Sequence, residues 1–400
     1  MRRLAAPAAA LMLVAALACK EQLTAPVNCP ELCPGEGLLV RDTVLLPLVG
    51  MDSSYTGYLA ANDVPALLVS DGLAAGEARA FADFPKRSDS ISVDGLMYAY
   101  TIDSVAISFG LLARDSMVPG LRLLLRRISP GTDTTATFQA VDSAFTQGEL
   151  VDSIVVADTL KTGQVRVVLP GDSLSLSRLT PAEGDSGRIG LGVGVRASAP
   201  TGVRLATRTD VSNPPTIIAY VQVPTPDTTR RKQTIILTAD HANYVIAGPP
   251  PPDADLLALG GRAGTRSLIR FTVPVALRDS ATVLRATLEL TPAAPILGLP
   301  NDPGTLQFRG VLADLGSKSV ALAVGGSLNV SAGASGVQSA DVRSIVSTWF
   351  TPNPPPSVIF IRLLPEGGSF ARAEFQSSRA ASGGPRLRVT YALPSRPGHP

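Results

Sequence analysis

The sequence predicts an all-β fold: two tandem β-sandwich domains of jelly-roll type, with one short helix in the second domain. Three observations lead to this prediction. The 34 proline and 36 glycine residues interrupt the chain too often for long helices. Between these interruptions, short runs alternate apolar and polar residues with period two, as strands with one buried face do. The order of the runs recurs in both halves of the chain, as an internal duplication would produce.

Residues 39–223 carry the first series of runs and are expected to form the first, more divergent β-sandwich domain. Turn-forming clusters such as Pro-Gly-Thr-Asp at residues 130–133 separate the runs. We expect no clear helix in this domain. The predicted strands cover residues 41–46, 104–109, 121–126, 165–169, 189–195, 203–207 and 217–221.

Residues 224–232 break the alternation and are predicted to be a linker, in which the basic residues 230–232 are solvated. Residues 233–394 then form the second domain. Its predicted strands cover residues 234–237, 267–271, 286–290, 305–308, 358–363, 371–375 and 386–391.

The two domains are related by matching segments in the same order. Two copies of this size indicate two domains of one fold rather than a solenoid. The matches join residues 42–45 to 233–236, 66–69 to 256–259, 79–85 to 266–272, and 215–220 to 385–391.

One helix is predicted in the second domain, with Ser339 as its amino-terminal cap. Its apolar residues follow the spacing i, i+3, i+4, i+7 of a helix with one buried face. Prolines at 352 and 354–356 prevent its continuation. The stripe consists of Val342, Ile345, Val346 and Trp349.

Trp349 is the only tryptophan, and we expect it in the core rather than in a binding surface. The strand faces that carry Leu268, Phe271 and Leu288 are predicted to cover it.

Residues 1–19 have the pattern of a signal sequence: two arginines, then an apolar stretch too short to span a bilayer. The motif Ala-Leu-Ala-Cys at 16–19 resembles a lipobox. This resemblance implies a diacylglyceryl thioether on Cys19 and, with Lys20 instead of Asp, an outer-membrane destination. The alternative is an ordinary signal peptide cut near Ala18. Residues 20–38 are proline-rich and are predicted to be a tether.

Cys29 and Cys33 are the only other cysteines. In an oxidising compartment, a local disulfide between them is the favoured interpretation. A redox-active pair is the weaker alternative, because three residues rather than two separate the thiols.

The second copy, about residues 233–394, resembles the DNRLRE-type domain, a secreted bacterial jelly roll grouped with carbohydrate-binding modules. The resemblance implies a jelly-roll fold and extracellular polysaccharide as a ligand. Where that family has an Asn-Tyr-Gly loop, this chain has the proline-rich residues 248–252. The motifs that carry the resemblance to the DNRLRE-type domain are residues 238–240, 256–260, 267–271, 283–290, 347–349, 375–379 and 385–391.

No constellation predicts catalysis. His241 has no nucleophile-elbow sequence to act with and is expected to be structural or on the surface. Gly190, Gly192 and Gly194 alternate along a strand, so they lie on one sheet face and form no phosphate loop. No metal or other cofactor is predicted. The oxygens weighed for calcium are those of Asp240, Asn243, Asp253 and Asp255, without a supporting spacing, and the aromatic residues weighed for sugar stacking are Tyr55, Tyr58, Tyr98, Tyr100 and Tyr244.

The expected function is therefore that of an exported lipoprotein of the cell envelope, on either membrane face. It would act as a non-catalytic binding or adhesion module, with polysaccharide as the candidate ligand. The alternative is a structural scaffold or spacer that binds envelope proteins. The net charge of +2 and the absence of a long basic run argue against nucleic acid as a partner.

Overall fold

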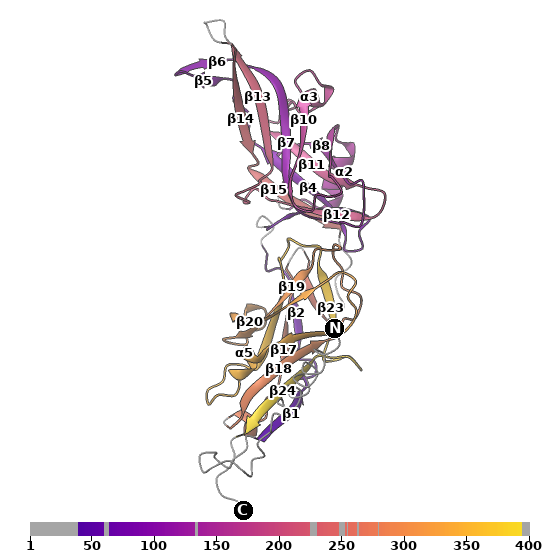
Figure 1. The fold of residues 1–400 in the computed structure, drawn as a ribbon, viewed down its shortest axis with the longest axis vertical. Coiled ribbons are helices and arrows are strands. Elements are labelled where there is room, and N and C mark those ends of the chain that lie inside the picture. Colours follow the sequence, from indigo (N-terminus) through magenta and orange to yellow (C-terminus); the bar gives the residue numbers. More distant parts are fainter. Residues whose placement is uncertain are drawn as a thin grey trace, which may run out of the picture.

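The computed structural model describes residues 39–59, 64–132, 135–224, 230–247, 253, 255–261, 264–278 and 280–393. The fold is all-β, as the sequence predicts, and its strands form two lobes stacked along the long axis (Figure 1). Each of the runs predicted as strands falls within or largely within an observed strand. Alternation was a sufficient signal because nearly every strand buries one of its faces.

The inserted lobe, as we call it, is built around one sheet of eleven strands that curls around a single core. Its central order is β14-β13-β7-β12-β3-β4-β11-β8-β9, with β10 on β7 and β15 on β4. The bounds are β3 (Leu67–Asp71), β4 (Glu77–Phe84), β5 (Ile91–Val93), β6 (Leu96–Tyr98), β7 (Thr101–Arg114), β8 (Arg122–Ile128), α2 (Phe138–Gln147), β9 (Leu150–Val155), β10 (Gly163–Pro170), α3 (Leu174–Arg178), β11 (Ile189–Arg196), β12 (Thr201–Leu205), β13 (Thr216–Pro224), β14 (Arg230–Thr238) and β15 (His241–Ala247).

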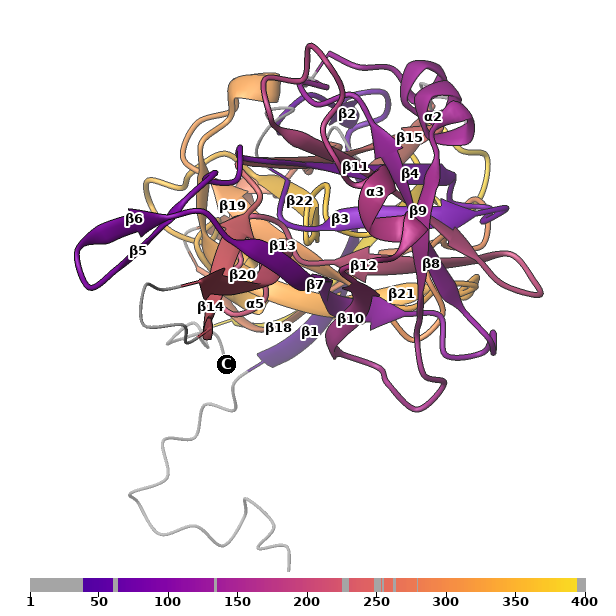
Figure 2. The same cartoon turned by 90° about the horizontal axis from the view of Figure 1, so that it is seen from above.

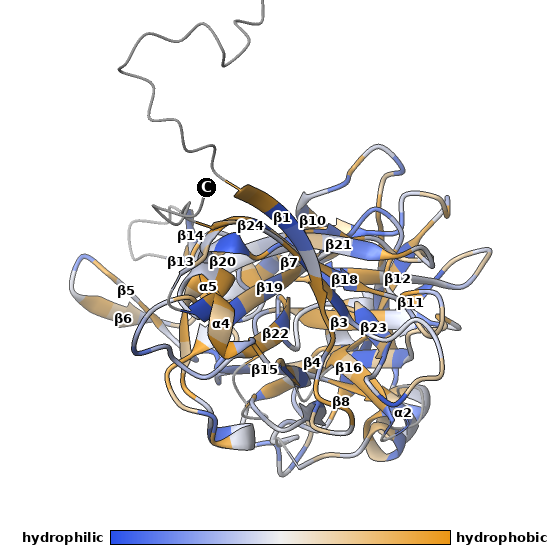
Figure 3. Ribbon diagram, turned by 90° about the horizontal axis from the view of Figure 1, so that it is seen from below, coloured by the Kyte–Doolittle hydropathy of each residue, from blue (hydrophilic) through white to orange (hydrophobic). Residues whose placement is uncertain are grey.

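The terminal lobe packs a four-stranded sheet, β1-β24-β18-β21, against a five-stranded sheet, β2-β17-β22-β19-β20, and adds the pair β16-β23. Figure 3 views this lobe from below, with β1 beside β24. The bounds are β1 (Leu39–Leu45), β2 (Ser53–Tyr55), β16 (Leu256–Gly260), β17 (Arg266–Arg270), α4 (Val275–Arg278), β18 (Thr282–Leu290), β19 (Gly304–Val311), the 3₁₀ turn η2 (Gly316–Lys318), β20 (Ala321–Val330), β21 (Gln338–Asp341), α5 (Arg343–Ser347), β22 (Val358–Leu364), β23 (Arg372–Gln376) and β24 (Arg386–Leu393).

Strand pairing does not follow the expected domain boundaries of 39–223 and 233–394. The first strands of the chain, β1 and β2, pair with β24 and β17 of the terminal lobe. The strands after the expected linker, β14 and β15, pair with β13 and β4 of the inserted lobe. The segment predicted as a linker thus joins two paired antiparallel strands. The inserted lobe is an insertion between β2 and β16.

Each half of the predicted duplication therefore contributes its first strands to the other lobe. Leu45 of β1 faces Leu387 of β24, and Leu237 of β14 faces Ile217 of β13. Both leucines are buried in the core of the lobe they join. The two first strands occupy equivalent positions, in which Leu45 corresponds to Leu237. The sequence match instead aligns Leu45 with Ile236, one residue earlier. Periodicity could not reveal this exchange, because either partner strand would bury the same apolar face.

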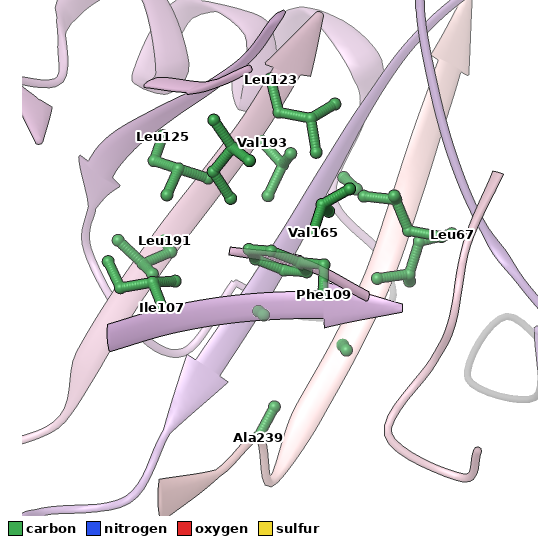
Figure 4. Packing of buried hydrophobic residues seen from close by; sticks show 14 of the residues in the cluster. Leu67, Ile107, Phe109, Leu123, Leu125, Val165, Leu191, Val193 and Ala239 are labelled. Atoms are coloured by element: carbon green, nitrogen blue, oxygen red, sulfur yellow. The ribbon is translucent and has the colours of Figure 1, made fainter. Parts of the chain in front are cut away.

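The core of the inserted lobe contains aliphatic side chains from across the curled sheet (Figure 4). Its outer face carries helix α2, which the sequence analysis did not expect. Thr137 caps this helix, and Phe145 packs where a Cβ on Gly192 or Gly194 would lie only 2.9 or 2.4 Å from its ring. The alternating glycines thus make room for a helix on the sheet. Only two helix residues, Val141 and Phe145, are buried, which explains the weak helical signal.

The core of the terminal lobe forms around Trp349, as predicted. All four residues of the predicted stripe are buried, and the Trp349 ring lies 6.0 Å from that of Phe271. Three details differ. The helix is a single turn, Arg343–Ser347, so Val342 and Trp349 lie just outside it, and its amino-terminal cap is Val342, which makes no side-chain hydrogen bond. Ser339 lies in β21, and the carboxylate of Asp341 accepts a hydrogen bond from the Arg343 amide. Leu268 packs in a separate cluster on the other sheet face, because neighbouring strand residues point to opposite sides.

A packed joint connects the lobes. Phe370 of the terminal lobe belongs to the core of the inserted lobe. Arg204 and Asp302, both largely buried, form an ion pair across the joint at 2.6 Å. The buried Tyr244 hydroxyl donates to the Gly367 carbonyl at 2.5 Å. With two chain crossings between the lobes as well, this joint restricts rotation that a single linker would allow.

Replacing Trp349 by alanine should lower the free energy of unfolding by about 3–5 kcal/mol, the usual cost of emptying a large aromatic site in a core. Urea unfolding followed by circular dichroism measures the effect, since the variant loses the only tryptophan fluorophore. Val324→Ala, at an exposed position of the same lobe, should change stability by less than about 0.5 kcal/mol. Equal stabilities of the two variants would contradict a core role for Trp349.

Candidate functional site

A hollow with aliphatic walls lies in the inserted lobe, beneath helix α3. Its volume is about 430 Å³. Helix α3 lies toward the end of the lobe that is remote from the joint (Figures 1 and 2). The hollow is open to solvent, because exposed side chains such as Lys86 and Asp172 belong to its lining.

The walls of the hollow are aliphatic and come from both sides of the curled sheet. Alternation along β7, β13 and β14 points one face of each strand into the core. Near the hollow, part of this face is not covered by other core side chains. Helix α3, capped by Ser173, covers the remaining side. The apolar lining consists of Ile102, Val105, Leu176, Leu179, Ile189, Ile217, Ala219 and Leu237.

Charged residues occupy the rim of the hollow. Lys86 and Asp89 form an ion pair at 3.0 Å. The guanidinium of Arg87 lies over the Tyr100 ring, 5.9 Å from its centre. Asp172 is exposed on the loop before α3. This arrangement can bind an apolar group inside and a charged group at the mouth, but it offers no nucleophile with a base.

His241 and Asp83 form a second polar cluster, on the paired strands β15 and β4. Burial raises the pKa of the Asp83 carboxyl, although the Gly131 amide donates a hydrogen bond to it and His241 lies nearby. The His241 ring packs 5.8 Å from that of Phe81. Among the described residues, no hydrogen bond joins this pair to a serine or cysteine side chain.

The tyrosines weighed for sugar stacking are all engaged in packing. Tyr244 is fully buried, Tyr55 packs on an apolar cluster beside Phe360, and Tyr98 and Tyr100 pack against the core of the inserted lobe. The Tyr58 ring is covered by the guanidinium of Arg266 at 4.0 Å. The structure describes every aromatic residue of the chain, and none is in the exposed class.

The oxygens weighed for calcium do not converge. Asp240 pairs with Arg188 at 3.3 Å, and Asp255 with Arg379 at 3.5 Å. Within the described ranges, no group of three or more His, Cys, Asp or Glu side chains is arranged to hold a metal ion. In the same ranges, no helix is long and apolar enough to cross a membrane. Cys19, Cys29 and Cys33 lie outside the described residues.

The hollow was not foreseen from the sequence. Its rim comes from the loops after β4 and β10, and its walls from strands on both sides of the expected domain boundary. Leu237, for example, was assigned to the second domain. The basic segment at 230–232 lies in β14 and not in a linker. Arg231 and Lys232 are exposed, as expected, and Arg231 pairs with Asp94 at 2.6 Å.

No family model and no curated protein matches the chain. One solved structure with low similarity is the N-terminal CBM22-1-CBM22-2 tandem domain from Paenibacillus barcinonensis Xyn10C, with 10% identity, 87% of this chain and 98% of that chain covered, and a TM-score of 0.14. Another is the Macrobrachium rosenbergii nodavirus, with 8% identity, 89% of each chain and a TM-score of 0.13. Likenesses this low carry no argument. The resemblance to DNRLRE-type domains stays a prediction.

Proposed function

We propose that this chain is an exported, lipid-anchored protein of the cell envelope that acts without catalysis, as a binding or adhesion module. The observation that supports this most is the pairing of β1 with β24, which places Leu39 beside Leu393 at the end of the terminal lobe remote from the joint (Figures 1 and 3). An anchor on Cys19, joined through residues 20–38, would attach at this end. The inserted lobe would then face away from the membrane.

The features of the inserted lobe favour a protein partner over a polysaccharide for this module. Sugar rings pack their CH faces on exposed aromatic rings, and the described chain exposes none. The hairpin β5-β6 instead projects from the lobe (Figures 1 and 2) and exposes Leu96 and Met97, at 61% and 63%. Its turn is fixed by Asp94 and Gly95, both with positive φ, and by the ion pair of Asp94 with Arg231. A projection with an aliphatic tip suits contact with another protein.

Replacing Cys19 by alanine should abolish incorporation of a labelled fatty acid and move the protein from the membrane fraction to the soluble fraction. The thioether is the only anchor that this proposal provides. Cys29→Ala, ten residues along the same segment, should leave the label and the fractionation unchanged. A Cys19→Ala protein that still takes up label and sediments with membranes would contradict the anchor.

Replacing both Leu96 and Met97 by aspartate should reduce capture of an envelope protein by the immobilised chain at least tenfold, since two apolar contacts would become charged. Val211→Asp, a change at a 99% exposed position of the same lobe, should leave capture unchanged. Affinity chromatography from envelope extracts, alongside a panel of polysaccharides, measures both. Retention of a polysaccharide, with no protein partner whose capture depends on the hairpin, would favour the carbohydrate alternative.

A further inference from the structure

The hollow beneath α3 is an open pocket with aliphatic walls. Its volume of about 430 Å³ falls within the range of small-molecule sites, roughly 300–1,000 Å³. Six of its lining residues also belong to the lobe's core: Val105, Leu179, Ile189, Ile217, Ala219 and Leu237. The hollow therefore extends the apolar core to the surface, where an apolar ligand could cover it.

The walls of the hollow select an aliphatic occupant. None of the side chains that line it is aromatic, so it provides no ring face for a sugar or a nucleobase. Serine and threonine hydroxyls occur only on the α3 side, and that of Ser173 donates to Pro170 and accepts the Leu176 amide. Polar groups placed against the aliphatic side chains of β7 and β13 would lose their hydrogen bonds to water without replacement. A hydrocarbon chain would lose none.

The charged side chains at the rim determine which charge is preferred on the head group of a ligand. Arg87 is half-buried, and the described residues give its guanidinium neither an ion pair nor a hydrogen bond, only the face of Tyr100. Lys86 is already paired with Asp89. Asp172 is exposed and therefore more strongly screened by water than Arg87. The guanidinium of Arg87 is thus the least compensated charge at the mouth. The forked arrangement of its donors matches a carboxylate.

We propose that this hollow binds a straight-chain aliphatic carboxylate, with the chain between the sheet walls and the carboxylate on Arg87. This site goes beyond the proposed function, because it requires neither the anchor nor the hairpin. A failure of the site would leave that function untouched, and the reverse also holds.

Calorimetric titration of the full-length protein with a series of straight-chain carboxylates, each below its micelle-forming concentration, tests the proposal. Affinity should rise roughly fourfold with each added methylene, which corresponds to about 0.8 kcal/mol per buried CH₂, and should level off when the hollow is full. The carboxylates should bind about three- to fivefold more tightly than the matching alcohols, as one partly exposed ion pair predicts. The matching amines should bind more weakly than the alcohols.

Two variants locate the site. Arg87→Gln should remove the preference for carboxylate over alcohol but keep the dependence on chain length. Arg166→Gln is the matched control, because Arg166 also lies over a tyrosine ring, that of Tyr220, but does not line the hollow. Ala219→Leu, which extends a side chain into the hollow, should weaken binding of the longest carboxylate at least tenfold. Thermal unfolding of this variant tests whether it is folded.

Several outcomes would overturn the proposal. They are the absence of binding by any member of the series, an affinity independent of chain length, and a carboxylate preference that survives Arg87→Gln. Unchanged binding by a folded Ala219→Leu protein would place the ligand elsewhere. If Ala219→Leu fails to fold, the comparison of Arg87→Gln with Arg166→Gln still decides whether the carboxylate binds at this hollow.

Discussion

The exchange of first strands between the two copies is the constraint on which the rest of the structure depends. β1 closes the four-stranded sheet of the terminal lobe on β24, while β14 extends the sheet of the inserted lobe on β13. Each pairing buries one leucine, Leu45 or Leu237, in the core of its lobe. Neither lobe is complete with only its own half of the duplicated sequence. The chain must cross between the lobes twice, and Phe370 and the buried pair Arg204–Asp302 fill the space where it does.

This exchange also connects the fold with both proposals. Pairing of β1 with β24 brings the two ends of the described chain together at one extremity, opposite the projecting hairpin β5-β6 (Figure 1). The proposed anchor would be joined to the described chain at this extremity. Pairing of β14 with β13 brings Leu237 into the wall of the hollow. A lobe built only from the first copy would lack this wall. The same strands that hold the lobes together thus shape the candidate ligand site.

The strands, the all-β class and the burial of Trp349 could be predicted from the sequence, because each depends on local periodicity. The partner of each strand could not. Thr234 to Leu237 read equally well as the start of a new domain, since alternation reports which face is buried and not on which core. Helix α2 was missed because only two of its residues are buried, Val141 and Phe145, the latter above Gly192 and Gly194. The hollow was missed because Arg87, Leu176 and Ile217 are brought together only by the curl of the sheet.

Separate expression of four fragments tests the exchange most directly. Residues 64–247 contain all strands of the inserted lobe and should unfold cooperatively in urea. Residues 233–394, the domain expected from periodicity, lack β1 and β2 and carry β14 and β15 without partners, so they should show no cooperative transition. Adding residues 39–59 to the second fragment on a separate peptide should restore one. Cooperative unfolding of both 39–223 and 233–394 as isolated fragments would contradict the exchange and, with it, the arrangement described for the two lobes.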